Sequence, residues 1–267
     1  MKYHSQSQVL SDHINHYWIV EDASELFSSN PKVLAYPGIR PEIVIIIKGY
    51  LTYTYMGKTH KVNKSILASH IHSHFLFDST HLEKFIIVQF KPRSVSALLP
   101  FTQYSSDQLM AQSVCFFEDV FGSEVAKLEQ SLLHRDGEQC VHMLDSFFSR
   151  RLRPQPAQFL IDMLSNLSYE SGIRTLLNET GYSISTLERH VKKETTLTPK
   201  RFLNLRKYKA AVEEIHSSQN QDWQYYVHKY HYSDQSHFIK SIKRYTAHTP
   251  SQLIKSPNLI SIRPAYF

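Results

Sequence analysis

Two short segments near the C-terminus hold side chains whose types and spacing suit hydrogen bonding to a polynucleotide. The first contains Ser185, Thr186, Glu188, Arg189, Lys192 and Lys193, and the second contains Gln235, Ser236, His237, Lys240, Lys243 and Arg244. Such groups can reach base edges from the start of a helix, and lysines and arginines further along suit phosphates. Glu188 could accept a hydrogen bond from cytosine or pair with Lys192. The segments therefore predict two base-reading helices in duplex DNA, with solvated charged faces as the alternative.

The surrounding residues predict two similar helical units, at 173–187 and 223–238. In each, a short helix is followed by a tight corner and a serine, Ser183 or Ser233, that can cap a second helix. Gly181 suits the left-handed conformation that ends the first helix of the first unit. A helix, a turn and a capped second helix form the geometry that places an α-helix in the major groove.

Each second helix is expected to bury one face and expose the other. Leu187 and Val191 lie four residues apart in the first unit, and Phe238 and Ile242 do so in the second. Because these apolar side chains should pack inward, the polar and basic side chains of the two segments are expected to face outward.

A long helix is predicted to join the two units, from Pro199 to about His216. Both units end in a threonine that can cap the next helix, followed by a proline at its first position, at 198–199 and 249–250. The inner stripe of the joining helix consists of Phe202, Leu205, Tyr208, Val212 and Ile215. At 1.5 Å per residue this rod is roughly 25 Å long, enough to hold the units toward major grooves roughly 34 Å apart.

These motifs resemble the AraC/XylS family of bacterial transcription regulators over about 80 residues. The similar stretches are 181–189, the Leu-Thr-Pro at 197–199, and 232–250 with its Tyr-Ser-Asp-Gln-Ser-His-Phe sequence. The resemblance implies two helix-turn-helix units that read adjacent major grooves of double-stranded promoter DNA. It also implies activation of promoters through RNA polymerase.

The N-terminal part resembles the sensory domains of the same family more loosely. The similar stretches occur in the expected order, at 17–18, 36–45, 89–92 with the Ala-Leu-Leu that follows, and 117–122. The resemblance therefore implies a regulator, most often an activator, that responds to a small-molecule effector. A regulator without a ligand, controlled by abundance or by a protein partner, is the alternative, with the N-terminal part as a platform for a homodimer.

Three turn residues depart from the family pattern. His231 occupies a turn position where the family usually has glycine, and Thr196 and Ala247 replace glycine in the two exit turns. A non-glycine residue held left-handed costs on the order of 1 kcal/mol. We therefore expect the first unit to read sequence and the second, with His231 at its turn, to contribute mainly affinity.

The distribution of charge supports an anionic partner for the C-terminal part. Residues 1–155 hold 15 Lys and Arg against 15 Asp and Glu, so residues 156–267 hold the remaining 15 of 30 basic and 9 of 24 acidic residues. The whole net charge of +6 thus comes from the C-terminal part, which favours nucleic acid over a membrane surface. Additional phosphate contacts, or solvated surface, are equally expected at Lys193, Lys200, Arg201, Arg206 and Lys207.

The first ninety residues predict a β-rich barrel of the cupin-like kind. Strands are expected at 33–36, 42–47, 51–56, 65–77 and 84–90, with a tight Gly57-Lys58 hairpin turn. Amphipathic helices are expected at 94–99, 118–134 and 138–152, and the face with Phe121, Val125, Leu128 and Leu132 should pack on the barrel rather than on a second subunit. The prolines at 154 and 156 mark a linker.

The expected fold is therefore a two-domain α+β protein. A β-rich sensory or regulatory domain with C-terminal helices occupies 1–152, and an all-α domain with tandem helix-turn-helix units occupies 157–267. Inside the barrel, an effector pocket could be lined by Trp18, Tyr36, Arg40, Glu42, Tyr53, Tyr55 and Phe90, although strand aromatics are more often plain core.

An alternative function is a metal-binding cupin-type enzyme domain fused to a DNA-binding module. His70, His72 and His74 alternate along one strand, so three imidazoles could share a face, with His81 or Glu83 nearby. The other face, with Leu67, Ile71, Phe75 and Phe77, is the better candidate for the core, which would direct the histidines to solvent. We therefore expect neither a metal nor another cofactor.

Composition excludes several other classes. Cys115 and Cys140 are the only cysteines, which indicates neither a disulfide framework nor a zinc site and favours a reducing compartment. The N-terminus lacks an apolar signal core, and the longest aliphatic run, 43–47, is too short to cross a bilayer. No Ser-His-Asp spacing, nucleotide loop or paired-carboxylate motif stands out. A cytoplasmic, non-enzymatic protein without a membrane partner is expected.

Overall fold

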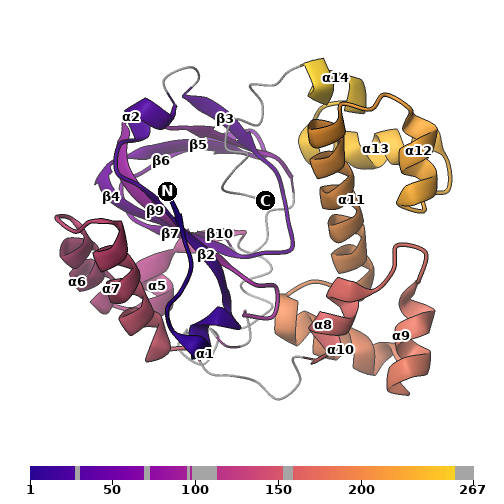
Figure 1. Ribbon diagram of the computed structural model, residues 1–267, viewed down its shortest axis with the longest axis horizontal. Coiled ribbons are helices and arrows are strands. Elements are labelled where there is room, and N and C mark those ends of the chain that lie inside the picture. The colour runs from indigo at the N-terminus through magenta and orange to yellow at the C-terminus, as the bar shows by residue number, and fades with distance from the viewer. Residues whose placement is uncertain (28–30, 69–72, 95–96, 98–112, 153–158, 256–267) are drawn as a thin grey trace.

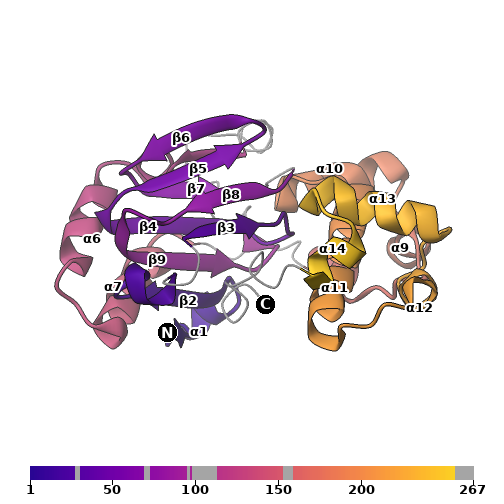
Figure 2. The ribbon, with the colours of Figure 1, turned by 90° about the horizontal axis from the view of Figure 1, so that it is seen from above.

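The computed structural model describes residues 1–27, 31–68, 73–94, 97, 113–152 and 159–255. A β-rich N-terminal part and an all-helical C-terminal part lie side by side (Figures 1 and 2). The fold is the expected two-domain α+β architecture with a cupin-like N-terminal part, although its two sheets do not close into a complete barrel.

The N-terminal part consists of two antiparallel sheets that face each other. The larger has the order β1-β2-β9-β4-β7-β10, with bounds Lys2–Tyr3, Ile14–Val20, Leu82–Phe90, Glu42–Gly49, Ile66–Ala68 and Val114–Phe116. The smaller has the order β3-β8-β5-β6, with bounds Lys32–Ala35, Phe75–Asp78, Leu51–Tyr55 and Lys58–Val62. Short helices α1 (Gln8–Ser11) and α2 (Ala23–Leu26) flank β2.

Both faces of the larger sheet are buried, which explains the unbroken apolar run in β4. On one face, Val44, Ile46, Phe85 and Ile87 pack against residues of the smaller sheet. On the other face, a second core is formed with the helices by Ile43, Ile45, Ile86, Val88 and Phe90. Alternate residues of one strand thus serve two cores, as the period of two in a strand requires.

Three helices cover the outer face of the larger sheet: α5 (Phe117–Phe121), α6 (Glu124–Leu132) and α7 (Gly137–Ser149). The predicted packing is confirmed, since Phe121, Val125, Leu128 and Leu132 are all buried in this core. The single helix predicted over 118–134 is wrong. Gly122 ends α5 at a φ of 76°, and α6 starts two residues later. Of the helix predicted at 94–99, residues 95–96 and 98–99 lie outside the described residues.

Two details of the predicted strands also need correction. The β5–β6 hairpin pairs Tyr55 with Lys58, so its turn residues are Met56 and Gly57, both with positive φ, rather than Gly57 and Lys58. The single strand predicted over 65–77 is replaced by β7 and β8, which belong to different sheets. The part between them, 69–72, lies outside the described residues.

The N-terminal residues are fastened to α7 by one buried carboxylate. Asp145, which is 8% exposed, accepts hydrogen bonds from Ser5 Oγ (2.8 Å), Gln6 N (2.8 Å), Ser7 N (3.2 Å) and Tyr17 Oη (2.6 Å). Burial and this carboxylate raise the pKa of the Tyr17 hydroxyl, so Tyr17 remains a donor. The carboxylate joins α7, β2 and the chain before α1.

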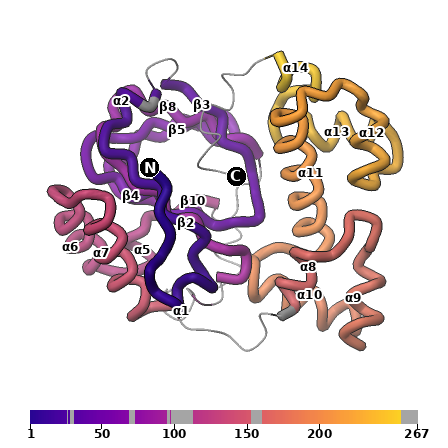
Figure 3. The backbone as a smooth tube through the Cα atoms, in the orientation of Figure 1, coloured from indigo at the N-terminus to yellow at the C-terminus, as the bar shows by residue number. Residues whose placement is uncertain are grey.

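The C-terminal part is built around the long helix α11 (Pro199–Ser218), with helices at each of its ends (Figure 3). At one end lie α8 (Phe159–Asn166), α9 (Ile173–Thr180) and α10 (Ile184–Thr195), and at the other α12 (Trp223–Lys229), α13 (Gln235–Thr246) and α14 (Pro250–Lys255). All five residues of the predicted inner stripe of α11 are fully buried. Together with the other helices they form a third, separate core.

Candidate DNA-binding helices and an interdomain pocket

The first unit, α9 and α10, has the predicted turn geometry. Gly181 ends α9 in the left-handed region at φ 67°, and Ser183 caps α10 by accepting a hydrogen bond from Thr186 N. Leu187 and Val191 are fully buried beneath α10. The opposite face of α10 is therefore free to meet a partner.

The second unit, α12 and α13, differs from the prediction at its cap. The cap of α13 is Asp234, whose carboxylate accepts from His237 N at 2.8 Å, rather than Ser233. The Ser233 hydroxyl instead lies 3.1 Å from Asp234 Oδ2 and from His237 Nδ1. A carboxylate is the stronger cap because it also interacts favourably with the positive end of the helix dipole.

The three non-glycine turn residues are indeed left-handed. His231 has a φ of 50°, Thr196 of 58° and Ala247 of 62°. Thr196 and Ala247 are the C-caps of the two candidate reading helices, and their backbone N–H groups donate to Lys192 O and Lys243 O. The chain thus tolerates at three turns the strain that glycine would relieve.

Each predicted base-reading side chain lies on an accessible face of α10 or α13. Thr186, Lys192 and Gln235 are partly exposed, and the exposed ones are Ser185, Glu188, Arg189, Lys193, Ser236, His237, Lys240, Lys243 and Arg244. Among the described residues, no ion pair joins Glu188 to Lys192. Gln235 accepts a hydrogen bond from Gln224 at 3.3 Å, which orients its amide.

Two of the lysines and arginines considered for phosphate contact have other partners. Arg206 donates to the carbonyl oxygens of Leu164 (2.7 Å), Ser165 (2.6 Å) and Leu167, where it satisfies the C-terminal end of α8. Lys207 donates to the carbonyl of His231 at 2.8 Å. Burial also lowers the pKa of Arg201, Arg206 and Lys207. Lys193 and Lys200 are exposed.

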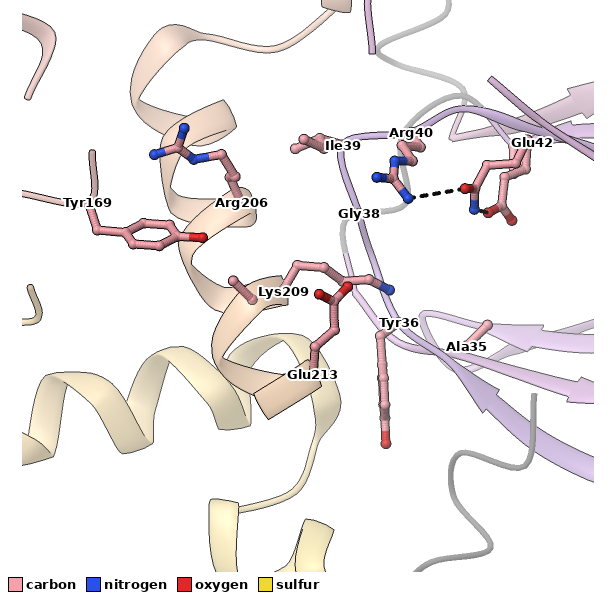
Figure 4. Close-up of a pocket in the computed structure, with 13 residues that line it drawn as sticks. Ala35, Tyr36, Gly38, Ile39, Arg40, Glu42, Tyr169, Arg206, Lys209 and Glu213 are labelled. Atoms are coloured by element: carbon pink, nitrogen blue, oxygen red, sulfur yellow. Dashed lines mark hydrogen bonds between the residues drawn. The ribbon is translucent and has the colours of Figure 1, made fainter. Parts of the chain in front are cut away.

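A pocket with a volume of about 200 Å³ lies between the two parts of the chain. Its N-terminal wall comes from the segment before β4 and from neighbouring strands, and its C-terminal wall comes from α11 and Tyr169 (Figure 4). The polar lining residues are Tyr36, Arg40, Glu42, Gln89, Tyr169, Arg206, Lys209 and Glu213. The side chain of Lys209 extends from α11 toward the N-terminal wall, with the Glu213 carboxylate beside it.

Burial dominates the electrostatics of this pocket. It raises the pKa of Glu42 and Glu213 and lowers the pKa of Lys209. Gln89 donates to Glu42 at 2.6 Å and accepts from Arg40 at 3.2 Å, so the two charged side chains are linked through an amide. Ionic groups held away from water in this way interact strongly with a charged or hydrogen-bonding molecule that displaces the remaining solvent.

Only three of the seven predicted effector residues line this pocket, namely Tyr36, Arg40 and Glu42. Trp18 and Tyr53 are buried in the core between the sheets, Tyr55 packs against that core and donates to Ser113, and Phe90 belongs to the core beneath the helices. These four side chains thus lie in or against the two cores of the N-terminal part and outside the interdomain pocket. Sequence reasoning missed the α11 wall, although Lys209 and Glu213 are four residues apart on one helix face.

Neither the metal alternative nor a membrane anchor gains support in the described part of the chain. His70 and His72 lie outside the described residues, and His74 alone of the three is described, partly exposed. Among described residues there is no group of three or more His, Cys, Asp or Glu side chains placed to hold a metal ion. No helix in the described part is long and apolar enough to span a membrane.

The paired exposed helices, capped and joined by α11, define a tandem helix-turn-helix domain, a class of domain that binds DNA. Residues 176–256 match the family described as helix-turn-helix domain, and the C-terminal part of this chain is a helix-turn-helix domain of the AraC type. No curated protein sequence matches the chain.

Comparison with solved structures finds distant similarities. An apo variant of ToxT from Vibrio cholerae is 10% identical, with a TM-score of 0.47 over 94% of this chain and 98% of that one. ToxT from Vibrio cholerae bound to an unsaturated fatty acid is 10% identical, with a TM-score of 0.44 over 89% and 94%. The AraC-like transcriptional activator CuxR is 12% identical, with a TM-score of 0.25 over 74% of each chain.

Proposed function

We propose that this protein is a sequence-specific DNA-binding transcription regulator whose two reading helices are α10 and α13. The observation that carries the proposal is the matched pair of helices in an AraC-type domain, each with a buried apolar side and an outer polar and basic side. The excess of basic over acidic residues in 156–267 supplies the attraction to phosphates. Such a regulator acts where the chromosome is, in the cytoplasm, and without an enzymatic step.

The direct contacts are assigned by position on each helix. Ser185, Thr186 and Arg189 in α10, and Gln235, Ser236 and His237 in α13, lie toward the helix N-termini, where base edges are reached. Glu188 in α10 is free of an ion pair with Lys192 and is available to accept from cytosine. The later basic residues, Lys192, Lys193, Lys240, Lys243 and Arg244, contact phosphates. We assign the N-terminal boundary of this domain to the segment 153–156.

Mapping the binding sites of the full chain across its own genome tests this function. Enriched sites should share one bipartite sequence, and binding should weaken as salt is raised. Arg189→Ala should lose about 1–3 kcal/mol at one base pair and relax the preference there, whereas Lys193→Ala should weaken all sequences alike. Enrichment that ignores sequence, or an Arg189→Ala variant with unchanged preference, would contradict the assignment.

We further propose that a small-molecule effector binds in the pocket between the domains. The supporting observation is that half-buried ionic side chains from both parts of the chain, Glu42, Lys209 and Glu213, line the pocket together, so an occupant would touch both domains at once. Occupancy would then alter the position of α11, on which both reading units are mounted. We also propose that the regulator activates transcription through contacts with RNA polymerase and that it forms a homodimer.

Native mass spectrometry of the full chain purified from its own host tests the pocket. A non-covalent small molecule should accompany the wild-type protein and be lost in Lys209→Met, which keeps the length of the side chain but removes its charge. Lys61→Met, at an exposed lysine outside the pocket, is the control and should retain the molecule. Equal retention by Lys209→Met would place the molecule elsewhere.

A further inference from the structure

The segment that leads into the first reading unit contacts the second unit through an aromatic pair, apart from the shared attachment of both units to α11. Tyr169 lies between α8 and α9, just before the first unit, whereas Tyr230 ends α12 of the second. Their ring centroids are 5.0 Å apart at an interplanar angle of 66°, an edge-to-face contact. Such a pair contributes to stability beyond the area that it buries.

Tyr169 is held firmly against α11, next to the end of α8. The Arg206 guanidinium lies 4.9 Å from the centroid of the Tyr169 ring, in a cation–π arrangement. The same guanidinium donates to carbonyls at the end of α8, so it cannot swing away without leaving them unpaired. The ring of Tyr169 therefore has a defined place relative to α8 and α11.

Tyr230 is held equally firmly on the side of the second unit. Its hydroxyl lies 2.8 Å from Glu214 Oε2 and 3.1 Å from the carbonyl of Ala210, both in α11. Glu214 also accepts from Lys229 at 2.6 Å and from Tyr225 at 2.7 Å, which fastens α12 to the C-terminal half of α11. These bonds lower the pKa of Glu214, which keeps it an ionised acceptor.

From Tyr230 the contact continues to the second reading helix. The Tyr226 ring is stacked 6.4 Å from Tyr230 and 5.7 Å from Phe238, at interplanar angles of 9° and 5°. Phe238 is fully buried in α13, directly after His237. A row of rings thus leads from Tyr169, just before the first unit, to the helix that presents Gln235, Ser236 and His237.

We propose that Tyr169 is a positioning residue that fixes the second helix-turn-helix unit relative to the first, and thereby sets the separation of the two half-sites that the protein accepts. The proposal rests on the DNA-binding function above. Inserting one base pair moves a half-site by about 3.4 Å and rotates it by about 35°. A rigid pair of units cannot follow that change, whereas units free to shift about α11 can.

The test uses the full chain and two measurements. Selection from random duplex DNA first gives the bipartite sequence and its spacing, and dissociation constants are then measured for duplexes with one base pair inserted or removed between half-sites. The wild-type protein should lose at least about tenfold in affinity on such a change, in line with the cost of one mismatched base pair. In Tyr169→Ala this loss should shrink several-fold, while affinity for an isolated first half-site stays unchanged.

Matched variants separate positioning from general destabilisation. Tyr169→Phe keeps the ring and should behave as the wild type. Tyr182→Ala removes a half-buried ring within the first unit, one that stacks on His190, and should leave the spacing penalty intact. Tyr230→Phe retains its ring but loses the contacts with Glu214 and Ala210, so it should relax the penalty partly and serves if Tyr169→Ala does not fold.

The outcomes are distinct. If the wild type selects no sequence, the DNA-binding function itself fails, and this inference fails with it. If the wild type selects a bipartite site but a folded Tyr169→Ala shows the full wild-type spacing penalty, the function stands and the positioning role is overturned. If Tyr169→Ala is unfolded, a folded Tyr230→Phe variant that shows the full wild-type spacing penalty also overturns the positioning role.

Discussion

The carboxylate of Asp145 offers a direct test of how the N-terminal domain is held together. It accepts two hydrogen bonds on each oxygen: Ser5 Oγ and Tyr17 Oη on Oδ1, and the backbone N–H groups of Gln6 and Ser7 on Oδ2. Asp145→Asn has the same shape but presents one oxygen and one N–H₂ group. If the N–H₂ group faces Gln6 and Ser7, two backbone donors meet a donor, and if it faces Ser5 and Tyr17, their hydroxyls can accept from it only by reversing both hydrogen bonds.

The expected cost follows from the loss of the carboxylate charge, which strengthens all four hydrogen bonds. A hydrogen bond to a charged group contributes about 1.5–3 kcal/mol and a neutral one about 0.5–1.5 kcal/mol, so each of the four bonds weakens by about 1 kcal/mol. Gln6 and Ser7 lie in a partly buried segment, so water can recover some of this. We therefore expect a net loss of about 3 kcal/mol. For a domain of this size that lowers the melting temperature by roughly 6–12 °C.

Tryptophan fluorescence provides the assay, because the chain has two tryptophans, Trp18 and Trp223. In a Trp223→Phe background, Trp18 reports on the N-terminal domain alone, where it lies in the core between the sheets. Glu83→Gln is the control, since it removes an exposed ion pair with Lys48 and should leave the melting temperature almost unchanged. A fall of less than about 2 °C in Asp145→Asn would refute the reasoning, since it corresponds to less than about 1 kcal/mol.

Three further predictions concern the interdomain pocket and the turns. Burial raises the pKa of Glu42 above its ordinary value of 4.5. Between the unfolded-state pKa and the higher folded-state pKa, the folded protein therefore binds more protons than the unfolded one, so its stability falls as the pH rises through that range. The melting temperature of Glu42→Gln should therefore exceed that of the wild type at pH 8, and the two melting temperatures should converge toward pH 4. An equal difference in melting temperature at pH 8 and pH 4 would contradict this. Gly181→Ala should cost about 1 kcal/mol in urea denaturation, since φ is 67° and nothing lies within 4 Å of the added Cβ, so only backbone strain is introduced. His231→Gly should gain about 0.5 kcal/mol, because relief of the left-handed strain exceeds the added chain entropy of the unfolded state; a loss would show that the imidazole makes a stabilising contact.

The helical half of the fold was predictable because its signals are local. Gly181, Ser183 and the Thr198-Pro199 pair each act on the backbone within one turn of their own position, and the structure uses all three as expected. The Asp234 cap was missed because Ser233 and Asp234 are adjacent and both can cap.

The pocket was not predictable because it depends on the packing of two domains. Tyr36, Arg40 and Glu42 were identified on the N-terminal side, but their partners Lys209 and Glu213 are more than 160 positions away in the sequence. Arg206 looked like a phosphate contact because nothing in the sequence shows that the carbonyls at the end of α8 need a donor there. The strand aromatics of the predicted barrel pocket turned out to fill the two sheet cores instead.

The helix α11 connects the pocket to the two candidate reading helices, because it contributes side chains both to the pocket wall and to the core beneath those helices. Its buried residues fall around much of its circumference, and include Phe202, Tyr208, Ala211 and His216. One side completes the core of both reading units, while Arg206, Lys209 and Glu213 on another side form the pocket wall. Arg206 touches Tyr169, and Tyr169 touches Tyr230. A molecule in the pocket would therefore contact both α11 and the Tyr169 ring, which by our proposal set the spacing of the two units. Its effect should appear as a change in preferred half-site spacing rather than in the base preference of either unit.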